Sequence, residues 1–325
     1  MNENSPKHGV LGQALDSLSK REGMDQKIFA DLHNHTTASD GDFTPEQLIK
    51  QAKALGIKAI GISDHDTLKA LKNAVAAGKK YDIEVICGVE VSIRFKRSYF
   101  TGTLHLLCYF KAERLLEDQF VEEFQNIMAQ GRGEKLVKAR VDEINKNFGP
   151  AGKTALLKRN LAFEDIASFS NNATRRHFAL ALKEGFGMID DDIVNTIIGN
   201  QSPAYLPSGI KLEEIIHFIR KNNILAVLAH PAAGSFSGRG HYKEVLPSLE
   251  IVEQVLPEFI EAGIQGLEVY YPGHIKEHQE LMKSWAKKFH LLVTGGSDCH
   301  DGIERPIGVS GISESEYIIF KESLA

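Results

Sequence analysis

The stretch Asp31-Leu32-His33-Asn34-His35, followed by Asp40, carries side chains that bind metal ions. His33 and His35 are two positions apart, so on a strand they would project from the same face. Residues 27–30 predict the end of a short apolar strand, which would place both imidazoles at a strand end. Imidazole is a common ligand of zinc and iron, although a His-x-His pair alone is more typical of two solvated side chains.

Similar polar residues follow other apolar runs of the chain. Further strands are predicted at 57–62, 83–89, 104–110, 224–229, 264–270 and 291–294. Helices are predicted at 45–55, 68–80, 212–221, 249–262 and 274–289. This alternation is typical of a parallel sheet or barrel, whose strand ends converge on one face. The candidate ligands at or beside these strands are His33, His35, Asp40, Asp64, His65, Glu90, His105, His230, Asp298 and His300.

The combination of these residues predicts a metal centre. Taken singly, each is more often a solvated residue or a hydrogen-bonded core residue than a ligand. Together they would bury charge at a barrel mouth, which destabilises a fold unless cations lie among them. Histidine and carboxylate without thiolate suit zinc, manganese or iron. About ten ligands exceed the needs of one ion, so we expect two or three ions, which activate water and stabilise displacement at phosphorus.

The composition is that of an ordinary globular protein, with 325 residues, 42% hydrophobic and 25% charged. A net charge of −5 provides no overall field that would attract nucleic acid. No apolar run is long enough for a membrane-spanning helix, and residues 1–26 lack the core of a secretory signal. The scattered cysteines Cys87, Cys108 and Cys299 predict a reduced, cytoplasmic protein. Strand alternation would turn Cys299 away from the metals.

Residues 111–205 interrupt the strand–helix alternation with helical spacing alone, which predicts an inserted helical region. Between residues 131 and 160 there are eight Lys/Arg and three Asp/Glu, a local net charge of +5. Such a segment either draws anionic substrates towards the site or is a solvated helix face.

The ordered motifs resemble those of the PHP (polymerase and histidinol phosphatase) family. They are His33-x-His35 with Asp40, Asp64-His65, Glu90, His105, His230-Pro231 and Ser297-Asp298-x-His300. The resemblance implies an α/β fold, a distorted (β/α)7 PHP barrel, with an inserted mainly helical subdomain. It divides the chain into an N-terminal extension (1–27), the barrel (28–110 and 206–313), the insert (111–205) and a C-terminal tail (314–325).

The same resemblance implies a trinuclear site. One ion would take His33, His35, Glu90 and Asp298. A second would share Glu90 and add His105 and His230. The third would take Asp40, His65 and His300. Asp64 would orient a ligand histidine and is counted with Glu90 among the catalytic residues; alternatively, it caps the helix that starts near Thr67.

The insert resembles that of 3′,5′-nucleoside bisphosphate phosphatases and 5′-to-3′ RNA exonucleases, through the run Ala173-Thr174-Arg175-Arg176-His177-Phe178-Ala179. The resemblance implies catalytic and phosphate-binding roles for Arg175 and His177, and guanidinium binds phosphate well. Arg176 departs from the pattern at a position that is often small or proline. The alternative is a solvated helix face. Arg239, in the glycine-rich loop after His230, is a further substrate-binding candidate unless it belongs to a plain surface loop.

The expected function is therefore that of a metal-dependent phosphoesterase that uses a metal-activated water and two to three Mn²⁺, Zn²⁺ or Fe²⁺ ions. The expected substrate is a 3′,5′-nucleoside bisphosphate or the 5′ end of a short RNA. The alternatives are histidinol-phosphate phosphatase, another small-molecule phosphomonoesterase, or a non-catalytic PHP module. The long insert argues against the first, and the full ligand set argues against the last. No membrane association is expected, and no protein partner can be inferred.

Overall fold

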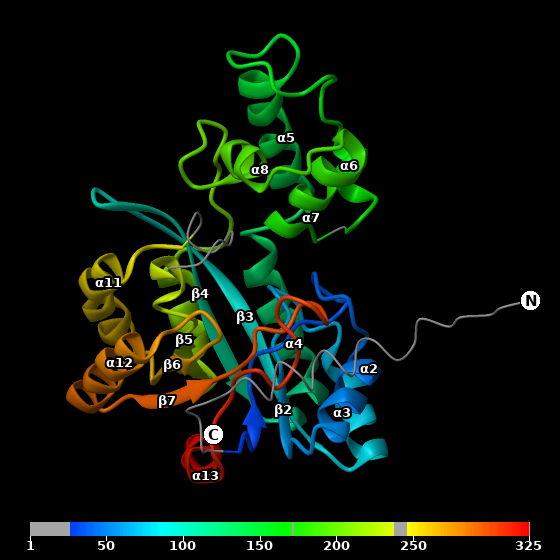
Figure 1. The fold of residues 1–325 in the computed structure, drawn as a ribbon. Coiled ribbons are helices and arrows are strands. Elements are labelled where there is room, and N and C mark those ends of the chain that lie inside the picture. Colours follow the sequence, from blue (N-terminus) through cyan, green and yellow to red (C-terminus); the bar gives the residue numbers. More distant parts are fainter. Residues whose placement is uncertain (1–26, 171, 237–245, 325) are drawn as a thin grey trace, which may run out of the picture.

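A seven-stranded sheet forms the centre of the molecule (Figure 1). The computed structural model describes residues 27–170, 172–236 and 246–324, so Arg239 lies outside the described residues. The strands follow chain order across the sheet. They are β1 (Ala30–Asp31), β2 (Ala59–Ile62), β3 (Glu84–Arg97), β4 (Phe100–Phe110), β5 (Leu225–Leu228), β6 (Gly266–Tyr270) and β7 (Leu292–Gly295).

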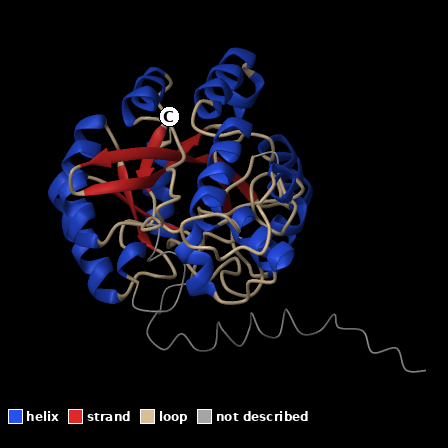
Figure 2. Cartoon of the chain, turned by 90° about the horizontal axis from the view of Figure 1, so that it is seen from above, coloured by secondary structure: helices blue, strands red, loops and turns tan. Residues whose placement is uncertain are grey.

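The sheet curls into a nearly closed barrel surrounded by helices, as Figure 2 shows from above. Its two outer edges meet where Leu32 N donates to Gly295 O at 3.2 Å and His35 N donates to Cys299 O at 2.9 Å. Asp31 strengthens this seam because its carboxylate accepts from Ser297 Oγ at 2.6 Å. The predicted distorted seven-stranded α/β barrel is thereby confirmed.

The strand directions differ from the parallel arrangement that the sequence predicted. β4 runs antiparallel to both β3 and β5, whereas the other neighbours are parallel. β3 and β4 are also longer than predicted and form one long hairpin. Because β4 runs in the opposite direction, His105 at the middle of β4 lies level with the second half of β3, where it pairs with Ser92. His105 therefore reaches the site without ending a strand.

The helices of the barrel and the insert account for most of the remaining described chain. The first group comprises α2 (Pro45–Ala54), α3 (Leu71–Tyr81), η1 (Ala112–Leu116) and α4 (Asp118–Ala129). The insert contains α5 (Glu134–Phe148), α6 (Phe163–Ala167), α7 (Arg175–Leu180), η2 (Ala181–Gly185) and α8 (Asp191–Ile198). The last group comprises α9 (Leu212–Lys221), η3 (Ala233–Ser235), α11 (Leu249–Ala262), α12 (Lys276–Phe289) and α13 (Glu314–Ser323).

Local sequence signals explain the ends of several helices. Thr44 and Gln47 form the predicted capping box of α2, and Gly56 follows the helix with φ +75°. Ser313 and Glu316 form another capping box at the start of α13, in the segment predicted as a tail. None of the helices in the described part of the chain is both long and apolar enough to span a membrane.

Strand alternation separates two apolar layers of the barrel. Along β3, Cys87 and Val89 face the outer layer of helices, whereas Ile86 belongs to the core inside the barrel. The inner core is closed at one end by Tyr317 and Phe320 of α13. Glu90 continues the inner row of Ile86 beyond this apolar plug, so the alternation places its carboxylate at the open end of the barrel.

The insert stands above the open end of the barrel (Figure 1) and has a core of its own. This second core runs from Val137 of α5 to Ala204 and includes Phe178 of α7. In contrast, α4 packs Phe120 and Phe124 into the outer layer of the barrel. The part of the chain that stands above the barrel thus begins after α4, later than the predicted start at residue 111, and it is mainly helical as predicted.

Candidate metal centre

Four of the predicted ligands meet at the end of the barrel that faces the insert. The Nε2 atoms of His33 and His35 lie 3.1 Å apart, so both rings project together from the end of β1. Glu90 Oε2 lies 3.3 Å from His33 Nε2 and 3.1 Å from His35 Nε2. Asp298 Oδ1 lies 3.0 Å from His35 Nε2. Their ligand atoms all fall within 4.8 Å of one another, which suits coordination of a single ion.

The other oxygen of Glu90 meets a second pair of histidines. Oε1 lies 3.0 Å from His105 Nδ1 and 2.9 Å from His230 Nε2, and the two ring nitrogens are 3.3 Å apart. Glu90 therefore presents one oxygen to each pair of histidines, which is the geometry of a bridging carboxylate. His65 also approaches this carboxylate, with Nδ1 3.0 Å from Oε2.

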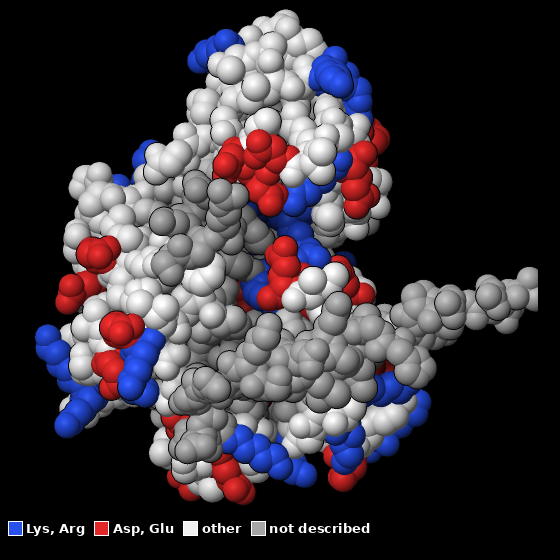
Figure 3. Space-filling view, viewed as in Figure 1, with Lys and Arg blue, Asp and Glu red and all other residues white. Residues whose placement is uncertain are grey.

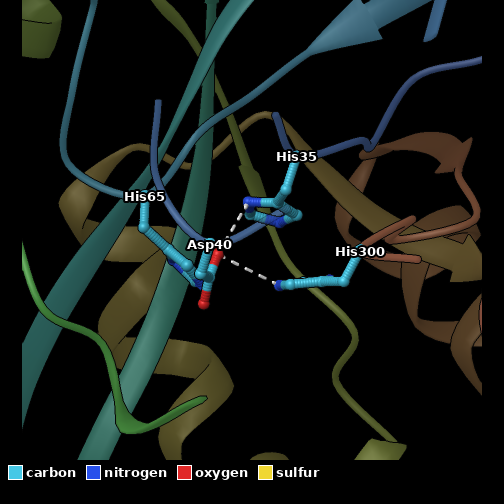
Figure 4. Close-up of side chains that lie close together, drawn as sticks. All are labelled: His35, Asp40, His65 and His300. Atoms are coloured by element: carbon cyan, nitrogen blue, oxygen red, sulfur yellow. Dashed lines mark ion pairs between the residues drawn. The ribbon is translucent and has the colours of Figure 1, made fainter. Parts of the chain in front are cut away.

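The third group consists of Asp40, His65, His300 and the neighbouring His35 (Figure 4). Asp40 Oδ1 lies 3.3 Å from His300 Nε2 and 3.9 Å from His35 Nδ1. All four side chains are buried. The structure thus brings together all nine predicted ligands. Some come from the part of the barrel sequence before the insert and the others from the part after it.

The hydrogen bonding of this cluster fits bound cations. Four buried atoms lack a hydrogen-bond partner among the described residues, although each faces other polar groups of the cluster. Buried polar atoms are normally hydrogen-bonded. These four atoms lie where they could coordinate metal ions instead. They are Asp40 Oδ1, His65 Nδ1, Glu90 Oε2 and Asp298 Oδ1.

The protonation equilibria of the cluster also fit cations. Burial lowers the pKa of His35, but Asp298 and Glu90 outweigh it and raise the pKa to about 9. Burial raises the pKa of Asp40, but His300 and His65 outweigh it and hold the pKa well below its usual range. Without metal, a proton on His35 therefore balances part of the carboxylate charge, and a bound metal ion would replace that proton.

Asp64 supports the loop between His35 and Asp40. Its carboxylate accepts from Thr36 N at 2.7 Å, Thr36 Oγ1 at 2.8 Å and Ser39 Oγ at 2.6 Å. The alternative role as a helix cap is wrong, because α3 begins at Leu71 without a side-chain cap. Cys299 is buried in the outer apolar layer, turned away from the cluster as predicted.

Two supporting residues were missed by sequence reasoning. Glu268 is fully buried on β6, where Oε1 lies 3.0 Å from His33 Nδ1 and Oε2 accepts from His230 N at 2.7 Å. Tyr271 donates its hydroxyl to Asp298 Oδ2 at 3.0 Å. The sequence did contain a signal for Glu268. This residue is a single carboxylate in an otherwise apolar strand, and both of its neighbours in sequence face the outer apolar layer.

A cavity of about 140 Å³ opens onto the cluster. Its wall contains ligand residues and a group of arginines, and Figure 3 shows Lys and Arg atoms in the hollow between the insert and the barrel. The arginines that line it are Arg132, Arg140, Arg175, Arg176 and Arg305.

These arginines have different partners. Arg132 contacts Asp66, Arg176 contacts Asp42 and Asp301, and Arg305 contacts Asp298. The other two contact neutral oxygens. Arg140 donates to Leu206 O at 2.9 Å and 2.7 Å, and Arg175 contacts Asn195 and donates to Ile198 O at 3.3 Å. Burial, together with the nearby charges of Arg132 and Arg175, lowers the pKa of Arg140 to about 10.

The structure places the two predicted substrate-binding residues of the insert differently. Arg175 lines the cavity. His177 is buried at the start of α7, where its Nδ1 accepts from Thr174 N at 2.9 Å, and it is not among the cavity-lining side chains. His177 is therefore placed to hold Thr174, whose hydroxyl donates to Asp40 Oδ2 at 2.7 Å.

Comparison with known proteins agrees with this geometry. The PHP domain family model matches residues 31–130. A 5′-3′ exoribonuclease of Haemophilus influenzae is 26% identical over 83% of this chain and 89% of its own length. A phosphoribosyl 1,2-cyclic phosphate 1,2-diphosphodiesterase of Eggerthella lenta is 26% identical over 84% of this chain and 94% of its own. A 3′,5′-nucleoside bisphosphate phosphatase of Chromobacterium violaceum is 26% identical over 83% and 86%.

The fold also has a close counterpart among solved structures. A Bifidobacterium adolescentis protein described as a metal-dependent phosphoesterase superposes with a TM-score of 0.70 at 23% identity. The match covers 93% of this chain and 98% of that protein. The barrel and the insert therefore recur together as one arrangement.

Proposed function

We propose that this chain, a PHP-domain hydrolase of phosphate esters, acts on nucleotides that carry a second phosphate: a 3′,5′-nucleoside bisphosphate or the 5′-phosphorylated end of a short RNA. The relatives named 5′-3′ exoribonuclease and 3′,5′-nucleoside bisphosphate phosphatase each align with more than four-fifths of the chain. The observation that carries the proposal is the position of Arg140 and Arg175 in the wall of the cavity that opens onto the metal centre.

The chain's own residues define where each part of such a substrate would lie. The metal ligands would be His33, His35, Asp40, His65, Glu90, His105, His230, Asp298 and His300. Two or three divalent ions held by these residues would lower the pKa of a coordinated water and neutralise charge on the phosphoryl group. Glu90 would contribute one oxygen beside His33 and His35 and the other beside His105 and His230.

Arg140 and Arg175, which we call the arginine wall, would hold the second phosphate. Arg140 and Arg175 are half-buried and donate to backbone or amide oxygens, which hold their guanidinium groups in place. A guanidinium binds phosphate through two parallel hydrogen bonds, which orients the substrate as well as attracting it. Histidinol phosphate has one phosphate and a cationic amine, which these arginines would repel.

A substrate panel tests the proposal. The kcat/KM of the manganese-loaded protein would be measured for a nucleoside 3′,5′-bisphosphate, the matching 3′- and 5′-monophosphates, a 5′-phosphorylated trinucleotide, a ribose 1,2-cyclic phosphate and histidinol phosphate. We expect the bisphosphate or the trinucleotide to exceed the monophosphates at least about tenfold, because a charge-assisted contact contributes about 1.5–3 kcal/mol. Equal rates for mono- and bisphosphates, or a preference for histidinol phosphate, would refute it.

A further inference from the structure

We infer that one segment of the insert, residues 172–176, completes one of the three ligand groups, so that metal occupancy at Asp40, His65 and His300 depends on the insert being docked on the barrel. We call residues 172–176 the docking segment. The inference rests on the proposed metal centre and goes beyond substrate binding, because it gives the insert a role in assembling the centre itself.

The first contact orients Asp40. Thr174 is buried and donates its hydroxyl to Asp40 Oδ2 at 2.7 Å. The other oxygen, Oδ1, then faces His300 and His35, as Figure 4 shows. A carboxylate that could rotate freely would present either oxygen, so this donor selects the one that meets the ion. His177 keeps Thr174 in place by accepting from its backbone N–H.

The second contact involves His65. Asn172 donates its side-chain N–H to the backbone oxygen of His65 at 3.1 Å. This bond joins the insert to the loop after β2 at the ligand residue itself. It fixes the position of the backbone from which the imidazole of His65 extends.

The third contact connects the loops that carry Asp40 and His300. Arg176 donates to Asp42 Oδ1 at 3.1 Å and to Asp301 Oδ2 at 3.2 Å. Asp42 lies two residues after Asp40, and Asp301 directly follows His300. The two loops are also joined directly, because Asp42 N donates to His300 O at 2.7 Å. The guanidinium of Arg176 adds a second link between them, from the insert.

The other side of the cluster is held differently. Glu268 of β6 holds His33, and Tyr271 holds Asp298. Both supporting residues belong to the barrel and lie on or directly after one of its strands. Each residue of the Asp40, His65 and His300 group is contacted, directly or through the residues beside it, by the docking segment. Loss of docking should therefore weaken this group and spare the group around His33 and Glu90.

The test measures metal binding rather than turnover. Thr174→Val removes the hydroxyl and keeps the shape of the side chain, and Arg176→Ala removes the guanidinium that bridges Asp42 and Asp301. Thr196→Val and Arg159→Ala are matched controls, because Thr196 bonds within α8 and Arg159 pairs with Asp165 inside the insert. Manganese per chain would be counted across a range of free Mn²⁺, and anomalous diffraction would locate the ions.

We expect both variants to bind one ion about 10- to 100-fold more weakly than the parent, as found when a residue supporting a ligand is removed. The weakened position should be the one between Asp40 and His300, while the controls match the parent. Parental affinity for every ion in both variants, or equal weakening of all ions, would overturn the inference. If Thr174→Val does not fold, Arg176→Ala, whose side chain is partly exposed, decides the outcome.

The experiment also separates this inference from the proposed function. A parent protein that binds no manganese at the cluster would refute the metal centre, and the proposed function would fail with it. A parent that binds its full set of ions, together with variants that do the same, would refute only the role of the docking segment.

Discussion

The barrel supplies the metal ligands from its strands and the loops that follow them, whereas the insert supplies Arg140, Arg175 and the docking segment from its helices and their connections. The imidazoles and carboxylates have short side chains, so their positions follow closely from a backbone fixed by the sheet and its two apolar layers. Arginine is long and reaches the cavity from several backbone positions, so its position depends on the acceptors that hold it. Under the proposed function, the barrel would hold the ions that carry out the chemistry, and the insert would help to select the substrate.

The largest expected effect comes from removing the bridging carboxylate of the barrel. Glu90→Gln should lower kcat/KM at least about 100-fold, because a neutral amide cannot balance two cations in a buried site. It should also reduce the metal content measured by elemental analysis. Glu84→Gln is the matched control, since Glu84 starts the same strand but is exposed and pairs with Lys321. Near-normal turnover in Glu90→Gln would contradict the bridging role.

A smaller effect is expected from the insert. Arg175→Ala should lose about 1.5–3 kcal/mol of phosphate binding, roughly ten- to a hundredfold in kcat/KM for a nucleoside 3′,5′-bisphosphate. Arg175→Lys should recover part of it, because lysine offers a point charge in place of a planar fork. Metal content should stay unchanged in both variants.

The structure requires a control for Arg175, because this side chain also contacts Asn195 of α8. Asn195→Ala removes that contact and keeps the guanidinium. If the two alanine variants lose thermal stability alike and Arg175→Ala keeps its activity, Arg175 is a packing residue of the insert.

The difference between the two regions also explains what the sequence predicted. His33, His35 and Glu90 were predictable because strand alternation and the order of apolar runs determine where their side chains point. The antiparallel direction of β4 was not predicted, since a run such as 104–110 reads the same in either direction. Its consequence is that His105 reaches the site from the middle of its strand.

The contacts of the insert were predicted less completely. Arg175 was identified, but the roles of Thr174 and Arg176 depend on which barrel loops lie beneath them. Those partners, Asp40, Asp42 and Asp301, are more than 120 residues away in the chain. Neither helical periodicity nor local charge predicts which distant residues a side chain will contact. These contacts could therefore be identified only in the folded structure.

A third prediction concerns proton release at the barrel cluster. The pKa of His35 is raised to about 9, so the metal-free protein holds a proton there at pH 7.5 that a metal ion must displace. Metal affinity should therefore rise as pH increases towards 9, by up to about tenfold per pH unit for each displaced proton. Calorimetric titration of Mn²⁺ in two buffers with different ionisation enthalpies would count the protons. Identical heats in both buffers would mean that His35 is already neutral.

The smallest expected effect comes from the exposed charges of the insert. Lys138 and Lys146 belong to the basic segment of α5, but each pairs with an acid on the same helix, Glu134 and Glu143 respectively. Exposed pairs of this kind contribute only about 0.2–1 kcal/mol and project little charge. Neither lysine lines the cavity.

The double variant Lys138→Ala/Lys146→Ala should therefore change kcat/KM less than about twofold for a nucleoside bisphosphate and for a 5′-phosphorylated RNA at physiological salt. The comparison of the two substrates is what makes this test informative. An RNA strand running across α5 would contact these lysines through its phosphates. Each lost contact would reduce the slope of log affinity against log salt concentration by about 0.7. A loss confined to the RNA, with a shallower salt dependence, would therefore extend the binding surface from the arginine wall onto α5 and identify an oligonucleotide as the substrate.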